Sequence, residues 1–353
     1  MKNVAFILRG CPGLGRFVGT FEISKILNDS GQYNLFYVTY LEGSSYLKKK
    51  GVEHLEISNR YDLTPLGIQP ISLSAEKIFD FIQENKIDAL IMDGEPLLAI
   101  SLKIEFPSIF LIAVLNPSDI VNSKIRPSIT KFFNYCYNHT DLKIVHGLHL
   151  VPVIPNQYSL STILRREVLD LDTRHENNCI SVVFGGGTTN STPEFYNSSF
   201  HFLENILNTA ELLPSIRFEI FWPGYNQKYS SKVLLNNVEL FNSHESPKQI
   251  YKNEIIIARA GRNTISEILY LNKKAILFAI CGEHRNSEQV KNAAYAARNA
   301  QGRIRFLETY SIEEIIESIH ILKHLSHINY NWEPGNNQLA ELLQTITAKR
   351  FNI

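Results

Sequence analysis

The segment from residue 255 to residue 267 constrains the fold of this 353-residue chain more than any other. Residues 255–257 are isoleucines, a short apolar run typical of a buried strand in a parallel sheet. An Arg-Ala-Gly-Arg-Asn turn follows, and a helix is predicted to open near Thr264. Because the N-terminus of a helix presents free N–H groups and the positive end of the helix dipole, such a turn favours a bound anion. The segment therefore predicts a strand–turn–helix unit that carries a ligand site.

A second apolar run, residues 275–280, follows the predicted helix, and polar residues gather behind it. Ligands of open α/β sheets bind at the carboxyl ends of the strands, so two neighbouring strand ends indicate one site. Glu267 is predicted in the first turn of the helix, where its carboxylate can accept hydrogen bonds from vicinal hydroxyls such as those of a ribose. The spacing alone is equally compatible with an ordinary βαβ unit that has an incidental glycine turn. The polar residues are Glu283, His284, Arg285, Asn286, Ser287, Glu288 and Gln289.

The order of residues across this region resembles that of a known family. Arg-x-Gly-x-x-Thr-x-x-Glu at residues 259–267 precedes a buried strand, and Glu-Gln-x-x-Asn-Ala follows at residues 288–293. This order resembles the donor-binding half of GT-B glycosyltransferases, in particular the C-terminal domain of the MurG-like enzymes of family 28. The resemblance covers most of residues 180–330 and is patchier before them. It implies an α/β protein of the GT-B fold, with two Rossmann-like domains whose parallel sheets face a central cleft.

A glycine-rich loop at residues 185–190 opens the region of resemblance. Three glycines followed by hydroxyl side chains let backbone N–H groups approach a diphosphate closely. The loop resembles the donor loop of GT-B enzymes, although a flexible turn between a strand and a helix has the same composition. The turn at residues 242–244 occupies the place where these enzymes recognise the nucleotide base.

The resemblance implies a role for each residue of the donor site. Glu267 would bind the ribose hydroxyls, the turn at residues 261–264 would hold the diphosphate, and Glu288 with Gln289 would contact the donor sugar. The expected donor site comprises Gly185, Gly186, Gly187, Thr188, Asn242, Ser243, Arg259, Gly261, Arg262, Asn263, Thr264, Glu267, Glu283, His284, Glu288 and Gln289. Because loops and a helix dipole can carry the charge of a diphosphate leaving group, we expect no metal ion and no cofactor.

Near the N-terminus, a predicted strand at residues 4–8 runs into a glycine-rich turn at residues 9–16. A Rossmann cofactor loop would have a different glycine spacing and an acidic residue after the second strand, which ends in Thr and Tyr near residue 40. We favour the acceptor-side loop of a GT-B enzyme, in which Gly13, Gly15 and Arg16 lie on the acceptor or phosphate side. Many family members carry a histidine where this chain has Arg16.

Arginine cannot act as a base near neutral pH, but it can pair bidentately with a phosphate or a carboxylate. Arg16 is therefore expected to bind an anionic group of the donor or acceptor, the alternative being a capping or surface arginine. The general base must come from elsewhere. A predicted strand at residues 87–92 ends in Asp93-Gly94-Glu95-Pro96, a turn similar to one in distant relatives of MurG. Asp93 or Glu95 is the predicted base, unless Asp93 only caps the next helix.

Another predicted strand, residues 108–115, ends at the same sheet edge in Asn116-Pro117-Ser118-Asp119. Asn116 and Asp119 are therefore candidate residues of the cleft, and Asn116 is placed on the acceptor or phosphate side. Residues 124–137 are aromatic and basic. They fit a core-packing helix better than a helix that faces an acceptor or a membrane, so a peripheral membrane contact stays open.

Length and composition limit the remaining possibilities. The length suggests two domains of roughly 150–180 residues. With 35 basic and 35 acidic residues the formal net charge is zero, which gives no bulk attraction to nucleic acid. No apolar run reaches the roughly 18–20 residues of a membrane span. The four cysteines are scattered, and His146 and His149 lack further ligands at metal-site spacing. We expect a soluble cytoplasmic protein without a disulfide framework or a metal site.

The expected division places an acceptor-side domain at residues 1–153 and a donor-binding domain at residues 154–335, with a proline-punctuated linker at 151–156. The terminal helix, residues 336–353, is expected to pack back on the first domain. The predicted function is metal-independent and inverting transfer of a sugar from a nucleotide diphosphate sugar, a UDP-sugar by family prevalence, to an acceptor hydroxyl or amine. Bacterial glycoconjugate or natural-product biosynthesis is the implied setting.

Three alternatives stay open. A nucleotide-sugar hydrolase would share the donor site and use water as the acceptor. A non-catalytic nucleotide-sugar sensor is compatible with the missing histidine. An epimerase of the related two-domain fold fits less well, because it should show more carboxylate and histidine pairs. The acceptor and the oligomeric state are not indicated.

Overall fold

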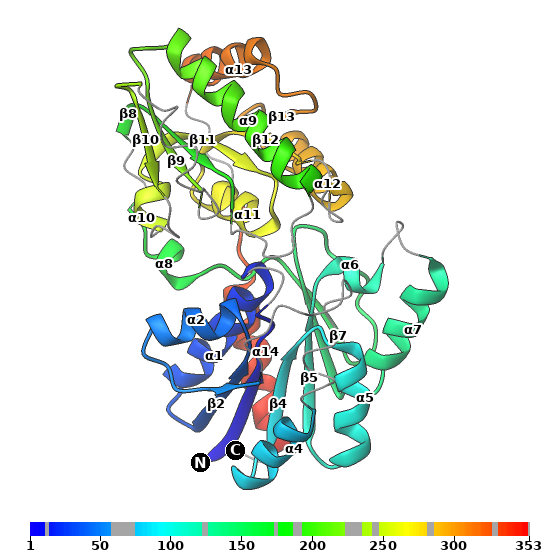
Figure 1. Ribbon diagram of the computed structural model, residues 1–353. Coiled ribbons are helices and arrows are strands. Elements are labelled where there is room, and N and C mark those ends of the chain that lie inside the picture. The colour runs from blue at the N-terminus through cyan, green and yellow to red at the C-terminus, as the bar shows by residue number, and fades with distance from the viewer. Residues whose placement is uncertain are drawn as a thin grey trace. The chain divides into compact units, whose positions relative to one another are not determined.

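The computed structural model describes residues 1–10, 14–57, 75–121, 126–172, 176–185, 193–222, 235–241, 247–280, 286–326 and 331–351. The chain divides into two compact units, which are coloured in chain order in Figure 1. The first unit contains Met1–Arg165 and Pro334–Ile353, and the second contains Arg166–Glu333. Each is an α/β unit built around one parallel sheet.

The sheet of the first unit has seven strands in the order β3-β2-β1-β4-β5-β6-β7. They are β1 (Lys2–Ile7), β2 (Tyr33–Thr39), β3 (Leu55–Glu56), β4 (Ala89–Asp93), β5 (Phe110–Leu115), β6 (Leu142–His146) and β7 (Gln157–Leu160). From β1 the chain builds outward to β3 on one side, and from β4 it builds outward to β7 on the other. The carboxyl ends of β1 and β4 therefore form the topological switch point, where ligands of such sheets bind.

Helices cover both faces of this sheet. They are α1 (Gly15–Asp29), α2 (Glu42–Lys49), α4 (Ala75–Glu84), α5 (Pro96–Glu105), α6 (Pro117–Ile120), α7 (Pro127–Tyr137) and α14 (Asn336–Phe351). The strands alternate between two cores: Ala5 and Ile7 belong to one, and Val4 and Phe6 belong to the other. Because both faces are buried, these strands consist of nearly continuous apolar residues.

The terminal helix α14 lies in the first unit, in red in Figure 1. Its apolar face joins the same core as Phe17 and Phe21 of α1. The residues on that face are Leu339, Leu342, Leu343 and Ile346.

The first unit continues past the expected boundary at residue 153. Strand β7 pairs with β6, with Ile144 opposite Tyr158, so the expected linker at residues 151–156 precedes a strand of this unit instead of ending it. The chain re-enters the first unit at Pro334. The N–H of Gly335 donates to the carbonyl of Thr162 over 3.0 Å and attaches this segment to the end of the unit's first part. An added Cβ at Gly335 would overlap with the carbonyl oxygen of Ser161, so a side chain does not fit there.

Helix α7 lies at the surface of the first unit and packs against α5 and α6. Its Cys136 and Tyr137 are buried, whereas Ile129, Phe132 and Tyr135 are exposed. The aromatic segment thus contributes two side chains to the interior and leaves three large ones in solvent, so core packing accounts for only part of its composition.

The second unit has a six-stranded parallel sheet in the order β10-β9-β8-β11-β12-β13. Its strands are β8 (Glu176–Val183), β9 (Arg217–Phe221), β10 (Val238–Phe241), β11 (Asn253–Arg259), β12 (Lys274–Phe278) and β13 (Ile304–Leu307). Its helices are α8 (Arg166–Leu169), α9 (Pro193–Leu212), α10 (Pro247–Ile250), α11 (Arg262–Tyr270), α12 (Asn286–Asn299) and α13 (Ile312–His324). The switch point here lies between β8 and β11.

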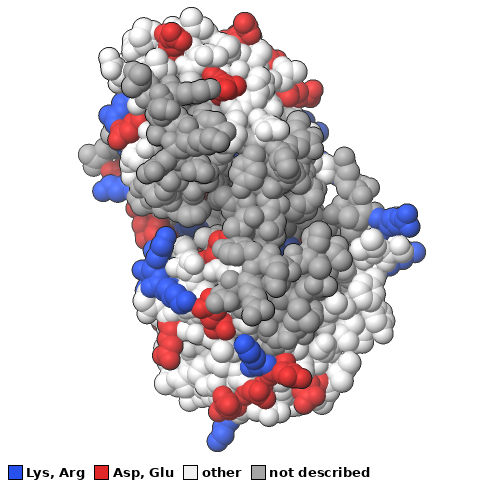
Figure 2. Space-filling view, in the orientation of Figure 1, with Lys and Arg blue, Asp and Glu red and all other residues white. Residues whose placement is uncertain are grey.

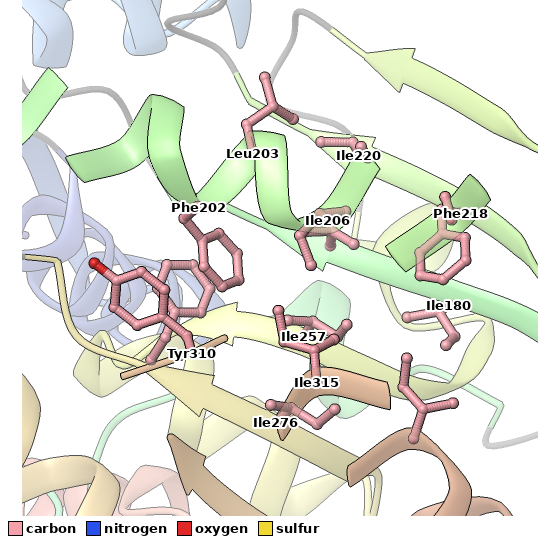
Figure 3. Close-up of a cluster of buried hydrophobic side chains, with 14 of the residues drawn as sticks. Ile180, Phe202, Leu203, Ile206, Phe218, Ile220, Ile257, Ile276, Tyr310 and Ile315 are labelled. Atoms are coloured by element: carbon pink, nitrogen blue, oxygen red, sulfur yellow. The ribbon is translucent and has the colours of Figure 1, made fainter. Parts of the chain in front are cut away.

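One core of the second unit is drawn in Figure 3, where side chains of α9 lie over those of the sheet. Phe202 and Ile206 of α9 pack in one cluster with Ile257 of β11 and Ile276 of β12. The isoleucine run of β11 is thus a fully buried strand, as its composition predicts.

The surface of the described residues carries both signs of charge. On the face in Figure 2, basic and acidic side chains are both present and neither sign covers it. None of the helices in the described residues combines the length and the hydropathy of a membrane span.

Candidate functional site

A buried ion-pair cluster lies at the switch point of the first unit. Arg16, in the first turn of α1, donates from Nε to Oδ1 of Asp93 at the end of β4 over 2.8 Å. Its Nη1 and Nη2 donate to the two carboxylate oxygens of Asp119 over 2.9 and 2.6 Å. This second contact is the bidentate geometry that makes guanidinium–carboxylate pairs strong.

The charges of this cluster stabilise one another. Burial works against the charged form of Arg16, but Asp119 and Asp93 outweigh it and raise the pKa of Arg16 well above its ordinary value. Burial also works against the Asp119 carboxylate, but the charge and hydrogen bonds of Arg16 lower its pKa. The anions that Arg16 contacts in the structure therefore belong to the chain itself, and its expected contact with a substrate anion stays a prediction.

Gly94 is the residue that lets Arg16 reach this position. Its φ of +48° lies in the left-handed region, and an added Cβ would overlap with Nη2 of Arg16. Asp93 does not cap α5: the N-cap residue is Glu95, and no side chain caps this helix. The alternative of a purely capping Asp93 is therefore wrong, because its carboxylate turns toward Arg16 instead.

Glu95 is buried beside the cluster, with 1% of its surface exposed. Its Oε1 accepts a hydrogen bond from the hydroxyl of Tyr40 over 3.3 Å and lies 3.5 Å from Nε of Arg9. Its other oxygen, Oε2, and Oδ2 of Asp93 are buried and accept no hydrogen bond from the residues that the structure describes. Two carboxylates in one turn thus each keep one oxygen for a further partner.

The environment of Glu95 raises its pKa from 4.5 to about 7. Burial is the largest cause, and the negative charge of Asp93 adds to it, whereas Arg9, Arg16 and Tyr40 act in the opposite direction. A carboxyl group with a pKa near neutrality can accept or release a proton at physiological pH.

The remaining predicted residues of this unit lie at the same sheet edge. Asn116 is buried at the end of β5, and its backbone N–H donates to Oδ2 of Asp119 over 2.8 Å. Gly15 is the first residue of α1, so the helix begins inside the turn predicted at residues 9–16. The sequence analysis did not single out Arg9 or Tyr40. The signal was present, since Arg9 follows β1 at the switch point and Tyr40 follows the neighbouring strand β2.

In the second unit, Gly185 follows β8 and Arg259 is the last residue of the adjacent strand β11. Val183 of β8 lies opposite Ala258 of β11. Gly185 has a φ of +80°, and a Cβ built on it would lie 3.0 Å from Nη2 of Arg259. The guanidinium group of Arg259 therefore lies against the first glycine of the expected donor loop. Only a residue without a side chain accommodates both the backbone angle and this approach without strain.

Helix α11 begins at Arg262, with Gly261 as its N-cap residue and no side-chain cap. Glu267 consequently lies in the second turn of the helix, whereas the sequence had predicted it in the first turn. Glu267 is 3% exposed, and its Oε2 accepts a 2.5 Å hydrogen bond from the hydroxyl of Tyr251. Tyr251 is a second residue that the sequence analysis missed, because it lies before β11 and outside the recognised motif.

Gln289 belongs to α12 and reaches back to the end of β12, where its Oε1 accepts from the backbone N–H of Ile280 over 3.4 Å. Glu288 is partly exposed in the first turn of α12. Arg262 donates from Nε to Oδ1 of Asn263 over 3.2 Å. The structure thus gathers residues from the carboxyl ends of β8, β11 and β12, which are neighbours in the sheet.

Eight predicted residues lie outside the described part of the chain: Gly13, Gly186, Gly187, Thr188, Asn242, Ser243, Glu283 and His284. Among the residues that are described, His, Cys, Asp and Glu form no group of three or more that could hold a metal ion.

Comparison with known proteins gives one family match. Residues 218–346 match the model of the glycosyltransferase family 28 C-terminal domain. The chain matches none of the curated proteins with which it was compared.

Solved structures of similar fold cover the whole chain. The crystal structure of Acinetobacter baumannii MurG is 16% identical, with a TM-score of 0.60, over 98% of this chain and 100% of that one. Spinosyn rhamnosyltransferase SpnG complexed with thymidine diphosphate is 12% identical, with a TM-score of 0.57, over 100% of both chains. A proposed UDP-N-acetylglucosamine 2-epimerase from Listeria monocytogenes is 10% identical, with a TM-score of 0.65, over 100% of this chain and 98% of that one.

The chain has two α/β units, each built on one parallel sheet, and this architecture matches GT-B structures. The predicted fold class is therefore confirmed. Residues 218–346 match the family 28 C-terminal domain, as the motifs of that region predicted, and the whole chain has the fold of the GT-B structures. A protein described as an epimerase shares this fold, so the fold alone does not determine the reaction. The reaction depends on the residues of the site.

Proposed function

We propose that this protein is a glycosyltransferase, which moves a sugar from a nucleoside diphosphate sugar, with uridine as the favoured base, to a hydroxyl or amine of an acceptor. The transfer inverts the anomeric carbon and needs no metal ion. The donor binds to the second unit and the acceptor to the first. The observation that carries the proposal is the strand–turn–helix unit of β11 and α11, which lies inside the matched family domain and holds the buried Glu267 beside its turn.

The donor is bound in this proposal by groups of distinct chemistry. The N-terminal N–H groups of α11 and the guanidinium group of Arg259 bind the diphosphate. Glu267 accepts hydrogen bonds from the ribose hydroxyls, and Tyr251 orients its carboxylate. Gln289 and Glu288 contact the sugar. A related GT-B protein, SpnG, is known in complex with thymidine diphosphate, which supports a nucleoside diphosphate as the ligand of this half.

Glu95 is the general base in this proposal. As the acceptor oxygen or nitrogen forms its bond to the anomeric carbon, its proton passes to Oε2 of Glu95, and the bond between that carbon and the diphosphate oxygen breaks. The departing diphosphate takes the electron pair, and its charge is stabilised by the start of α11. Asp93 is less suited to accept the proton because Arg16 holds its other oxygen in a 2.8 Å ion pair. A single displacement of this kind inverts the anomeric carbon.

Ligand-induced stabilisation tests the donor site. Thermal unfolding is followed with a panel of nucleoside diphosphates, and a ligand present at about 100 times its Kd should stabilise the chain by roughly 2.7 kcal/mol. Glu267→Ala should remove the effect. Glu317→Ala, which changes an exposed glutamate on α13 of the same unit, is the matched control and should retain it. If no diphosphate stabilises the wild-type chain, the donor assignment is wrong.

The fate of the sugar distinguishes the proposed reaction from its rivals. With the donor that binds best, nuclear magnetic resonance follows the anomeric signal in the presence and absence of an acceptor panel. Transfer to an acceptor with inverted configuration supports the proposal. Release of free sugar at the same rate without any acceptor identifies a hydrolase, and stable binding without turnover identifies a non-catalytic sensor.

A further inference from the structure

The two oxygens of the Glu95 carboxylate have different surroundings. Oε1 faces the hydroxyl of Tyr40 at 3.3 Å and the Nε of Arg9 at 3.5 Å. Tyr40 thus donates a hydrogen bond to Oε1, and Arg9 forms an ion pair with the same oxygen. Oε2 is buried and accepts no hydrogen bond from the described residues.

We infer that Arg9 and Tyr40 are positioning residues, which hold Oε1 of Glu95 so that Oε2 is the atom that takes up the proton. The inference deepens the base role that rests on the proposed function. Neither residue needs to touch the acceptor, because both act through the orientation of Glu95.

The fold holds Arg9 and Tyr40 in place together. Arg9 follows β1 and Tyr40 follows β2, and these strands are neighbours in the sheet. Between them, Gly10 packs directly on the backbone of Tyr40, where an added Cβ would overlap with the Tyr40 carbonyl oxygen. Arg9 also donates from Nη1 to the carbonyl of Gly94 over 3.4 Å. It therefore contacts both the side chain of Glu95 and the turn that leads to it.

The charges around Glu95 give this arrangement a measurable consequence. Arg9 is the strongest of the groups that counter the effect of burial on the pKa of Glu95, and the Tyr40 hydrogen bond acts in the same direction. Without either group the charged form of Glu95 loses a favourable contact, so the pKa should rise further. The titratable and charged groups that face Glu95 and its partners are Arg9, Tyr40, Arg16, Asp93, Asp119 and Tyr137.

Titration of Glu95 in the full-length chain tests the inference without any activity assay. The chain is labelled with ¹³C at the glutamate carboxyl carbon, and the Glu95 signal is identified by its loss in Glu95→Gln. Arg9→Met should raise the pKa of Glu95 by roughly one unit or more, because a neighbouring positive charge is lost. Arg9→Lys should restore most of the shift, and Tyr40→Phe should raise the pKa by less than Arg9→Met.

Infrared difference spectra show which oxygen carries the proton. In neutral Glu95 protonated at Oε2, Oε1 is the carbonyl oxygen, and hydrogen bonds to it lower the frequency of the C=O stretch. Tyr40→Phe should move this band to higher frequency. Tyr135→Phe, which removes a hydroxyl from an exposed tyrosine of α7, should leave it unchanged.

The results separate this inference from the proposed function. If neither Arg9→Met nor Tyr40→Phe moves the pKa and the C=O band of Glu95, the inference is wrong even in a chain that transfers sugar. If both change as expected in a chain that binds no diphosphate, the proposed function fails and the positioning of Glu95 stands. Tyr40→Phe and Arg9→Lys preserve the shape of the site, so the test remains decisive should Arg9→Met fail to fold.

Discussion

Arg16 cannot serve as a general base, but it forms the central ion pairs of the buried cluster. By the resemblance described above, it occupies the position at which many family members carry a histidine, and a guanidinium group cannot act as a base there. In the structure it joins the end of β4 to the start of α6 through Asp93 and Asp119. Removing one partner of a buried ion pair typically costs about 3–5 kcal/mol, because the remaining charge is left uncompensated. In the proposed function the base lies in the neighbouring turn, at Glu95, whose pKa is raised to about 7.

Gly94 should tolerate a side chain poorly for two reasons. Gly94→Ala adds the cost of a left-handed residue, about 1–2 kcal/mol, and a clash with Arg16 that should cost roughly 1–3 kcal/mol more. Urea unfolding measures the loss of stability. Gly31→Ala is the control, since Gly31 has a φ of +64° but open space around its Cβ position. Equal losses in the two variants would contradict the packing of Arg16 on Gly94.

Glu95 should set the pH dependence of sugar transfer. The base must be ionised to accept a proton, and the pKa of Glu95 is about 7, so kcat/KM should fall as the pH drops below that value. Glu95→Gln should lower the rate by roughly 10²–10⁴-fold and remove this part of the pH profile. Steady-state kinetics across the pH range measures both effects. Retained activity in Glu95→Gln together with lost activity in Asp93→Asn would make Asp93 the base.

At the level of elements, α14 ties the two ends of the chain into one core. Leu339 is fully buried among residues of α1 and the first sheet. Leu339→Ala should destabilise the first unit by about 2–5 kcal/mol, because it leaves a cavity in a packed core. Hydrogen exchange should show the loss of protection in that unit. Leu212→Ala is the control at a residue that is 62% exposed, and an equal effect there would contradict the packing of α14.

The elements themselves were largely predictable, and their ends were not. The isoleucine run predicted β11, and the apolar stripe of the last helix predicted α14. Helix α1 begins at Gly15, inside the turn predicted at residues 9–16. Its first turn contains Arg16, whose charge is neutralised by residues distant in sequence. Strand β7 was missed since its four residues, Gln-Tyr-Ser-Leu, follow a proline-punctuated segment and form a strand by pairing with β6.

For the whole molecule, the raised pKa of Glu95 predicts how stability depends on pH. Between 4.5 and about 7, folded Glu95 keeps a proton that the unfolded chain has already released. Stability therefore falls as the pH rises through this window, by about 3 kcal/mol in total from this residue. Lowered carboxyl pKa values such as that of Asp119 act in the opposite direction, but below this window.

Glu95→Gln should remove this loss. The difference in unfolding free energy between the variant and the wild type should grow in favour of the variant as the pH rises from about 5 to about 8. Denaturant unfolding at several pH values measures it. A difference that stays constant with pH would show that Glu95 titrates at its ordinary value.

Local patterns in the sequence were sufficient to predict the α/β class, the glycine turn at Gly261 and the resemblance to a family 28 domain. Apolar runs and glycine turns act over a few residues, so they can be read without knowing the fold. The buried ion-pair cluster of the first unit could not be predicted in this way. Arg16 and Asp119 are 103 positions apart, and Tyr40 and Glu95 are 55 apart. They meet because the strand order places β2, β1, β4 and β5 side by side, and the charge and pKa of each residue then depend on neighbours that only folding supplies.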